Sequence, residues 1–388
     1  MLGTFTYYNP TRLHFGAEAL NSLATEVRAY GKTIVLAYGG GSVKRSGLYD
    51  QIVAILEAEG KVVVDLPGVM SNPTIEKVRE GAALVKEHQA DLILAVGGGS
   101  VVDYAKAVSV SAYSDMDPWE KYFVQQLPID NPIVPVGAIV TMVGTASEMN
   151  GGSVISNHEA QLKLGRVFGA DVFPKFAIVN PELTYTVPHY QMVAGIFDIM
   201  SHLMEQYFSN TDDNTSDYII EGMMRSLINS SRAAVQNPKD YEARSNIAWT
   251  ATWALNGLVG KGKAQDWMVH MIGHAIGAVN DATHGMTLAS ISLAYYRHEL
   301  EAGLAKFVRF AKNVWDIHSE ELSEIELAEA GLQALEAWMK EIGVVTRLSE
   351  IDIQESDFDA ILAATRIYPA GYQALDAAQI REILRESL

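Results

Sequence analysis

The sequence contains no cysteine among its 388 residues. This absence excludes disulfide bonds, catalytic thiolates and every metal site that uses a thiolate ligand. A metal ion bound by this chain must therefore be held by histidine, aspartate or glutamate. The ten histidines and 47 acidic residues are the candidate ligands.

Long apolar runs are also missing, because no stretch of ~18 apolar residues occurs that could cross a bilayer. The opening "MLGTFTYYNPTRLHFG" lacks a charged leader followed by an apolar segment. Positive charge is scarce, since 29 lysines and arginines oppose 47 acidic residues and leave a net charge of −18. Such a chain repels phosphate backbones and anionic lipids. We expect a cytoplasmic protein with no nucleic-acid or membrane partner.

The length favours two domains, because single cores stop growing at ~250 to 300 residues. Short β-rich runs alternate with helical patterns in the first half, which predicts right-handed crossovers and a mostly parallel sheet. Beyond Pro188 the β-branched runs thin out and long helical patterns take over, at residues 189–208, 240–258 and 324–343. The sequence thus predicts an α/β domain over residues 1–184 and an all-helical domain over 185–388.

A glycine triplet in "LAVGGGSVVDYAKAV" follows an apolar strand and precedes a helix. Gly97, Gly98 and Gly99 let the backbone approach a ligand, and the helix N-terminus offers N–H groups to a pyrophosphate. The alternative is a plain strand-to-helix turn, with Ser100 and Asp103 as a capping box. The spacing differs from the GxGxxG fingerprint, so both interpretations stay open.

A second triplet in "AYGGGSVKRSG" adds Lys44 and Arg45 to Gly39, Gly40 and Gly41. No acidic residue stands in this turn to bind the ribose 2′-hydroxyl of NAD, whereas a basic residue accommodates the 2′-phosphate of NADP. The turn therefore favours NADP over NAD. The alternative is that its two cations are ordinary surface charges. The hydroxyl-rich loop "VTMVGTASEMN" and the turn "SNPT" are weaker signals of ligand contact.

Histidines gather in the helical half. Asp198 and His202 stand four residues apart, and His270 and His274 repeat that spacing, so each pair shares one helix face. His284 follows in "NDATHG", where a turn can direct it back toward the others. Histidine with carboxylate suits Zn²⁺ or Fe²⁺. Taken singly each residue is better explained by packing or by an ion pair, but the combination predicts a metal site.

These motifs together resemble the iron-containing alcohol dehydrogenase family, in its NADPH-dependent aldehyde reductase and butanol dehydrogenase branch. The resemblance runs from "YYNPTRLHFG" through "YGGGSVKRSG" and "DIMSHLMEQYF" to "KAQDWMVHMIGHAIGAVNDATHG". It implies the dehydroquinate synthase-like fold, with a dinucleotide-binding domain, a helical metal-binding and catalytic domain, and an active site in the cleft between them. It also implies a metal held by Asp198, His202, His270 and His284, with His274 close by but not ligating.

The cofactor contacts that the resemblance implies come from several loops of the α/β half. They are Gly39, Gly40, Gly41, Ser42, Lys44, Asn72, Gly97, Gly98, Gly99, Ser100, Asp103, Thr141, Thr145 and Lys163. Two departures from the family pattern stand out: "TMVGTASE" replaces a threonine pair followed by AGTGSE, and Gly40 stands where NAD-preferring members often carry an aspartate. The second departure again indicates NADP.

The expected reaction is hydride transfer between NADP(H) and a primary alcohol or aldehyde of broad range. The metal, Fe²⁺ or Zn²⁺, would polarise the carbonyl oxygen, and His274 would pass the proton. Alternatives are an NAD-dependent polyol dehydrogenase of the glycerol type, a lyase like dehydroquinate synthase, a metallohydrolase, or a nucleotide sensor. A symmetric homodimer is the expected assembly.

Overall fold

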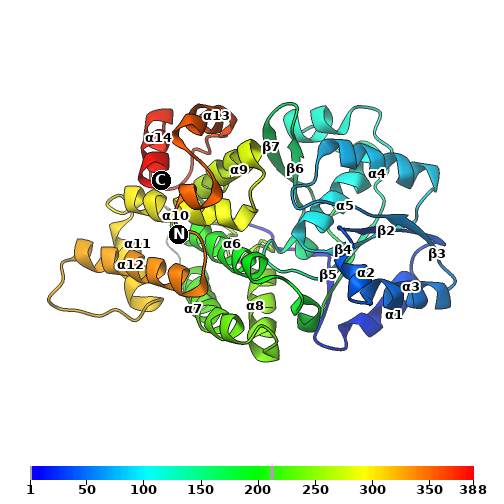
Figure 1. Ribbon diagram of the computed structural model, residues 1–388, viewed down its shortest axis with the longest axis horizontal. Helices are drawn as coiled ribbons and strands as arrows, with labels where there is room; N and C mark the ends of the chain where they lie inside the picture. Colours follow the sequence, from blue (N-terminus) through cyan, green and yellow to red (C-terminus); the bar gives the residue numbers. More distant parts are fainter. Residues whose placement is uncertain (1, 210–213) are drawn as a thin grey trace. The chain divides into compact units, whose positions relative to one another are not determined.

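The computed structural model describes residues 2–209 and 214–388 (Figure 1). The chain divides into two compact units. The α/β unit is Tyr8–Val187, and the helical unit is Pro188–Leu388 together with residues 2–7.

A six-stranded sheet in the order β1-β8-β5-β4-β2-β3 forms the centre of the α/β unit, and every neighbouring pair in it is parallel. This confirms the predicted fold class. Its strands are β1 (Arg12–Phe15), β2 (Thr33–Tyr38), β3 (Val62–Leu66), β4 (Leu92–Gly97), β5 (Val136–Val140) and β8 (Phe176–Val179). The central strands are near-continuous apolar runs, "TIVLAY" and "LILAVG", because both of their faces are buried.

Helices cover both faces of this sheet (Figure 1). One face packs against α1 and α3, and the other packs against α4 and α5. The helices of this unit are α1 (Leu23–Val27), α2 (Ser42–Arg45), α3 (Leu48–Ala58), α4 (Ile75–Glu87) and α5 (Gly99–Ser111). Short helical turns lie at Ala19–Ser22, Trp119–Val124, Ser147–Met149 and Pro181–Thr184. An antiparallel hairpin, β6 (Gly152–Asn157) with β7 (Leu162–Val167), was not predicted and contacts α5.

The strand order reverses between β2 and β4, which are neighbours in the sheet. The chain leaves β2 through α3 toward β3 on one side, and it leaves β4 through α5 toward β5 on the other. Ligands of open α/β sheets bind beyond the carboxyl ends of the strands at such a reversal. Because one glycine triplet follows β2 and the other follows β4, both stand at this position.

The helical unit contains the long helices that the sequence predicted, as α6, α8 and α12. Its helices are α6 (His189–Tyr207), α7 (Asn214–Gln236), α8 (Tyr241–Ala254), α9 (Met268–Asn280), α10 (His284–Glu299), α11 (Leu304–Asn313), α12 (Glu324–Ile342), α13 (Phe358–Ala364) and α14 (Ala377–Glu386), with short turns at Leu348–Ile351 and Glu355–Asp357. Local signals fix the ends of α12: Ser323 and Glu326 form a capping box, and Gly343 ends the helix with a φ of 81°.

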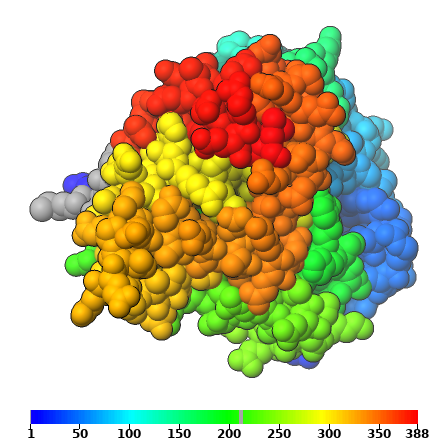
Figure 2. Space-filling view, turned by 60° about the vertical axis from the view of Figure 1, so that its left-hand side comes forward, coloured from blue at the N-terminus to red at the C-terminus, as the bar shows by residue number. Residues whose placement is uncertain are grey.

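Helix α6 lies at the centre of this unit, and nearly all its residues from Met192 onward are buried. It packs against α7, α8, α9 and α10. The C-terminal helix α14, red in Figure 2, lies on the surface and contacts α10. Among residues 2–209 and 214–388, no helix combines the length and the apolar character that crossing a bilayer requires.

Candidate metal centre and cofactor-binding turns

Four predicted ligands converge in the helical unit. Asp198 and His202 lie one turn apart on α6, His270 lies on α9, and His284 is the first residue of α10. Asp198, His202 and His270 are buried, and each offers a ligand atom within 4.8 Å of those of the other two. His284 joins them, with its Nε2 atom 3.7 Å from Asp198 Oδ1.

One carboxylate oxygen stands at the focus of this set. Asp198 Oδ1 lies 3.4 Å from Nε2 of His202 and 3.6 Å from Nε2 of His270. Two ligands at ~2.1 Å from a metal ion, at the tetrahedral angle, lie about 3.4 Å apart. The observed separations match that spacing and exceed the usual length of an N–H···O hydrogen bond. Asp198, His202 and His270 are therefore spaced as ligands of one ion, and His284 Nε2 stands at a similar distance from Asp198.

The electrostatics of the centre also suit a cation. Burial alone would lower the pKa of His270, but the charges of Glu205 and Asp198 outweigh burial and raise that pKa to about 9. The buried Nε2 atom of His270 has no hydrogen-bond partner among the residues that the structure describes. The side chain of His284 is 23% exposed while that of His202 is 3% exposed, so His284 is the more accessible of the two.

Glu205 contacts a predicted metal ligand, and the sequence analysis missed it. It is fully buried on α6, where His270 Nδ1 donates to its Oε1 atom and Ser201 Oγ donates to the same oxygen at 3.0 Å. The backbone N–H of His270 donates to the other oxygen at 3.3 Å. A carboxylate on the far nitrogen of a ligating histidine fixes its tautomer and ring orientation. The sequence does contain a signal for this contact, because Glu205 follows Asp198 by two helical turns and therefore lies on the same face of the helix.

His274 lies beside the ligands, as expected from its position one turn after His270. It is buried on α9, and its ring centroid lies 6.0 Å from that of His270 and 5.1 Å from that of His284. Among the described residues, the group formed by Asp198, His202 and His270 includes neither His274 nor His284. The assignment of His274 as a proton carrier stays a prediction.

The turn after β4 is shaped for close approach of a second loop. A Cβ atom on Gly99 would meet the Thr145 side chain at 2.2 Å, and one on Gly98 would meet Met142 at 3.2 Å. The N–H of Thr141 donates to the carbonyl of Gly97 at 2.9 Å. Thr141 and Thr145 therefore lie against this turn, as expected for residues that share a ligand with it.

The capping-box interpretation of this turn is wrong. Helix α5 begins at Gly99 with Gly98 as its N-cap and no side-chain cap. Ser100 Oγ instead donates to the carbonyl of Ser71. Asp103 accepts from Ser147 Oγ with one oxygen and from the Val154 N–H with the other, at 2.9 Å. Because no side chain caps α5, its N-terminal N–H groups remain available to an anion.

Asp103 thus holds the loop at Ser147 and the strand β6 in place, and all three belong to the α/β unit. Both of its oxygens accept hydrogen bonds there, and its side chain is 13% exposed. We therefore expect it to act on a cofactor through the loop that carries Thr145, rather than by a contact of its own.

The turn after β2 is the more open of the two. A Cβ atom on Gly40 would meet nothing within 4 Å in the described chain, and Gly41 has a φ of 99°, which favours glycine. Ser42 begins the short helix α2, on which Lys44 extends a side chain that is 48% exposed. Asn72 and Lys163 contact each other, since Lys163 Nζ donates to Asn72 Oδ1 at 2.7 Å.

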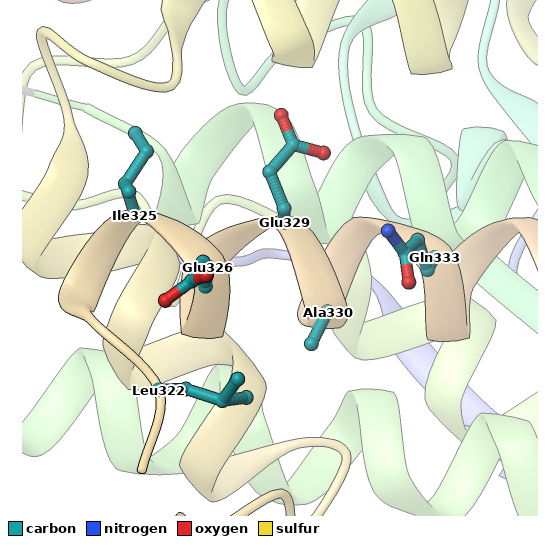
Figure 3. Close-up of a pocket in the computed structure, with 6 residues that line it drawn as sticks. All are labelled: Leu322, Ile325, Glu326, Glu329, Ala330 and Gln333. Carbon is teal, nitrogen blue, oxygen red and sulfur yellow. The ribbon is translucent and has the colours of Figure 1, made fainter.

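A pocket elsewhere contains none of the predicted site residues. Figure 3 shows it on α12 and the segment before it, lined by Leu322, Ile325, Glu326, Glu329, Ala330 and Gln333. Its lining offers two carboxylates and no histidine, so it lacks the groups that the expected chemistry requires.

Comparison with known proteins agrees with this geometry. The model of the iron-containing alcohol dehydrogenases matches residues 10–181, and that of the C-terminal domain of the Fe-containing alcohol dehydrogenase family matches residues 192–388. The chain belongs to the iron-containing alcohol dehydrogenase family, which confirms the resemblance noted in its motifs. It is by family a metal-dependent alcohol dehydrogenase.

Particular relatives cover nearly the whole chain. A probable NADH-dependent butanol dehydrogenase of Bacillus subtilis is 38% identical over 99% of both chains. An NADPH-dependent aldehyde reductase of Escherichia coli is 35% identical over 93% of this chain and 92% of its own. The structure of an NADH-dependent butanol dehydrogenase from Thermotoga maritima superposes with a TM-score of 0.94 at 33% identity, covering 100% of this chain and 99% of that one.

Proposed function

We propose that this enzyme transfers hydride between NADP(H) and a primary alcohol or aldehyde, and works mainly as an aldehyde reductase. The observation that carries the proposal is the spacing of three histidine nitrogens at 3.4 to 3.7 Å from one oxygen of Asp198. We assign residues 1–184 to binding of the dinucleotide and residues 185–388 to the metal and the substrate. A cytoplasmic location and a homodimer stay predictions of the sequence.

Two features support a nicotinamide cofactor in the α/β unit. Both glycine triplets stand where the strand order reverses, and α5 presents an uncapped N-terminus there. The named relatives include NADH-dependent and NADPH-dependent enzymes. Lys44 beside the first triplet, with no acid in that turn, favours NADP(H) for this chain.

The chemistry divides between the bound groups and the residues of the chain. A divalent metal held by the four ligands would supply a Lewis acid for the substrate oxygen, and reduced nicotinamide would supply the hydride to the carbonyl carbon. Glu205 accepts a hydrogen bond from Nδ1 of His270, and this contact keeps Nε2 of the same ring directed toward Asp198 and the other candidate ligands. We assign to His274, which lies next to His284, the transfer of a proton to the substrate oxygen as the alcohol forms.

His270→Ala tests the proposal. This variant removes a ligand from α9, so we expect loss of bound metal and a fall in kcat/KM with NADPH and a short aldehyde of about three orders of magnitude. Metal content is measured by elemental analysis, and turnover by the absorbance of reduced nicotinamide. His318→Ala, at an exposed position whose described partner is Asp316, is the matched control. Retention of metal and full metal-dependent activity by His270→Ala would refute the assignment.

A further inference from the structure

An acidic residue lies beside Lys44, although none is present in the glycine turn. At the carboxyl ends of β2 and β3, Asp65 Oδ2 stands 3.7 Å from Lys44 Nζ. The ammonium group also lies 4.3 Å from the ring centroid of Tyr49 and 5.1 Å from that of Tyr38. Lys44 is therefore shared between a carboxylate and two aromatic rings.

Asp65 is held in a fixed orientation. The hydroxyl of Tyr49 donates to its two oxygens, at 2.9 Å each. Burial and the neighbouring Asp65 raise the pKa of Tyr49 to about 12, so the phenol keeps its proton at neutral pH. The side chains of Asp65 and Lys44 are 38% and 48% exposed. Both charges are thus accessible to a ligand while their relative position is maintained.

The place of Asp65 in the fold matches that of the acid that binds ribose in other dinucleotide folds. That acid comes about 20 residues after the glycine turn and binds the ribose 2′-hydroxyl of NAD. Asp65 comes roughly two dozen residues after Gly41, on β3, where it pairs in register with Leu36 of β2. It is on the strand next to the one that ends in the first glycine triplet.

We propose that Asp65 is a specificity-determining residue, which accepts the 2′-hydroxyl of NAD(H) and repels the 2′-phosphate of NADP(H). The proposal rests on the proposed use of a nicotinamide cofactor. Lys44 and Asp65 then act in opposition: the cation attracts the 2′-phosphate, and the carboxylate beside it weakens that attraction. The enzyme is expected to accept both cofactors, with NADP(H) the better of the two and the ratio set by this pair.

Asp65→Asn is the direct test, because it removes the charge and keeps the shape of the side chain. We expect kcat/KM for NADPH to rise and that for NADH to fall, which shifts their ratio by about tenfold or more toward NADPH. Lys44→Met should shift the ratio in the opposite direction. Glu59→Gln removes the same charge from an exposed pair with Arg28 in the same unit, and should leave the ratio unchanged.

Binding of cofactor fragments separates this inference from the proposed function. Calorimetric titration with adenosine 2′,5′-bisphosphate and with ADP reports the 2′-phosphate preference without turnover. Tighter binding of the bisphosphate to Asp65→Asn than to wild type, with ADP no tighter, supports the inference. An unchanged preference in both Asp65→Asn and Lys44→Met overturns it, even if the enzyme reduces aldehydes. Failure of wild type to oxidise either reduced cofactor would instead count against the proposed function.

Discussion

Glu205 links two of the helices of the candidate metal centre, α6 and α9. It stands on α6 with two of the candidate ligands, and it holds His270 of α9 through a ring nitrogen and a backbone N–H. A fully buried carboxylate is costly unless its oxygens are hydrogen-bonded, and here both of them accept hydrogen bonds. Its position is thus explained by the hydrogen bonds that it accepts from His270 and Ser201 rather than by apolar packing.

Glu205→Gln should weaken metal binding while the four ligands remain. The amide keeps the size of the side chain but loses the charge that makes His270 a stronger metal ligand. We expect metal affinity to fall by about 10- to 100-fold. Competition with a chromophoric chelator measures this affinity without reference to turnover. Glu320→Gln removes the same charge from an exposed loop position and should bind metal as wild type does. Equal affinity in the two variants would show that Glu205 does not orient the ligand.

The candidate metal ligands could be singled out from the sequence because their spacing follows the helix period. Asp198 with His202, and His270 with His274, are four apart, and only helical spacing makes such pairs neighbours. Asp65 was missed because no local spacing in the sequence connects it with Lys44. It follows the first glycine triplet at a distance in the chain, and only the pairing of β3 with β2 brings it beside Lys44.

At the scale of elements, a buried ion pair ties α5 to the loop that carries Thr145. Lys106 is fully buried, and its Nζ atom donates to the carbonyl of Ser147 at 2.9 Å and to the carbonyl of Asn150 at 3.2 Å. It also lies 3.6 Å from Asp103 Oδ1. Burial lowers the pKa of Lys106 to about 8, and burial raises that of Asp103. This loop is therefore held in place by a charged pair that is costly to bury.

Lys106→Met should loosen that loop and leave Asp103 without its cation. We expect the free energy of unfolding to fall by about 3 kcal/mol, as when one partner of a buried pair is removed. Affinity for NADPH should fall as well, because Thr145 is no longer held against Gly99. Urea unfolding and fluorescence titration of the cofactor measure the two effects. Lys86→Met, on the exposed side of α4, is the control. Unaltered cofactor affinity in a folded Lys106→Met would contradict the positioning role.

The elements themselves were predicted where one physical signal dominated. Apolar runs followed by glycine predicted β2 and β4, and the helical pattern of residues 324–343 predicted α12. The hairpin β6–β7 was missed because its strands contain lysine, arginine and glycine, and their burial depends on contact with α5. The capping box at Ser100 was wrong because tertiary contacts took both side chains. Local patterns cannot report such competition.

At the scale of the whole molecule, the large negative charge means that ionisation of a buried acidic residue lowers the stability of the fold. The chain carries a net charge of −18, so each further ionisation inside it adds to repulsion. Glu299 is such a group: it is the last residue of α10, and its side chain is 1% exposed. Burial raises its pKa from 4.5 to about 7, and a helix C-terminus also disfavours a negative charge.

Glu299→Gln should therefore stabilise the protein at alkaline pH. The folded chain holds this proton more tightly than the unfolded chain does, so the stability due to Glu299 falls as pH rises from about 4.5 to about 7. After allowance for solvent screening, the loss is on the order of 2 kcal/mol. We expect the variant to exceed wild type by that amount at pH ~8 and by little at pH ~5.

Urea unfolding at the two pH values, with a chelator present so that metal binding does not contribute, measures the difference. Glu301→Gln, two residues further on and exposed, removes the same charge and should change stability equally at both pH values. A pH-independent effect of Glu299→Gln would mean that this carboxyl group is already ionised in the folded chain at low pH. The burial of Glu299 would then be compensated by its neighbours, and the decline of stability toward alkaline pH would have to arise from other groups.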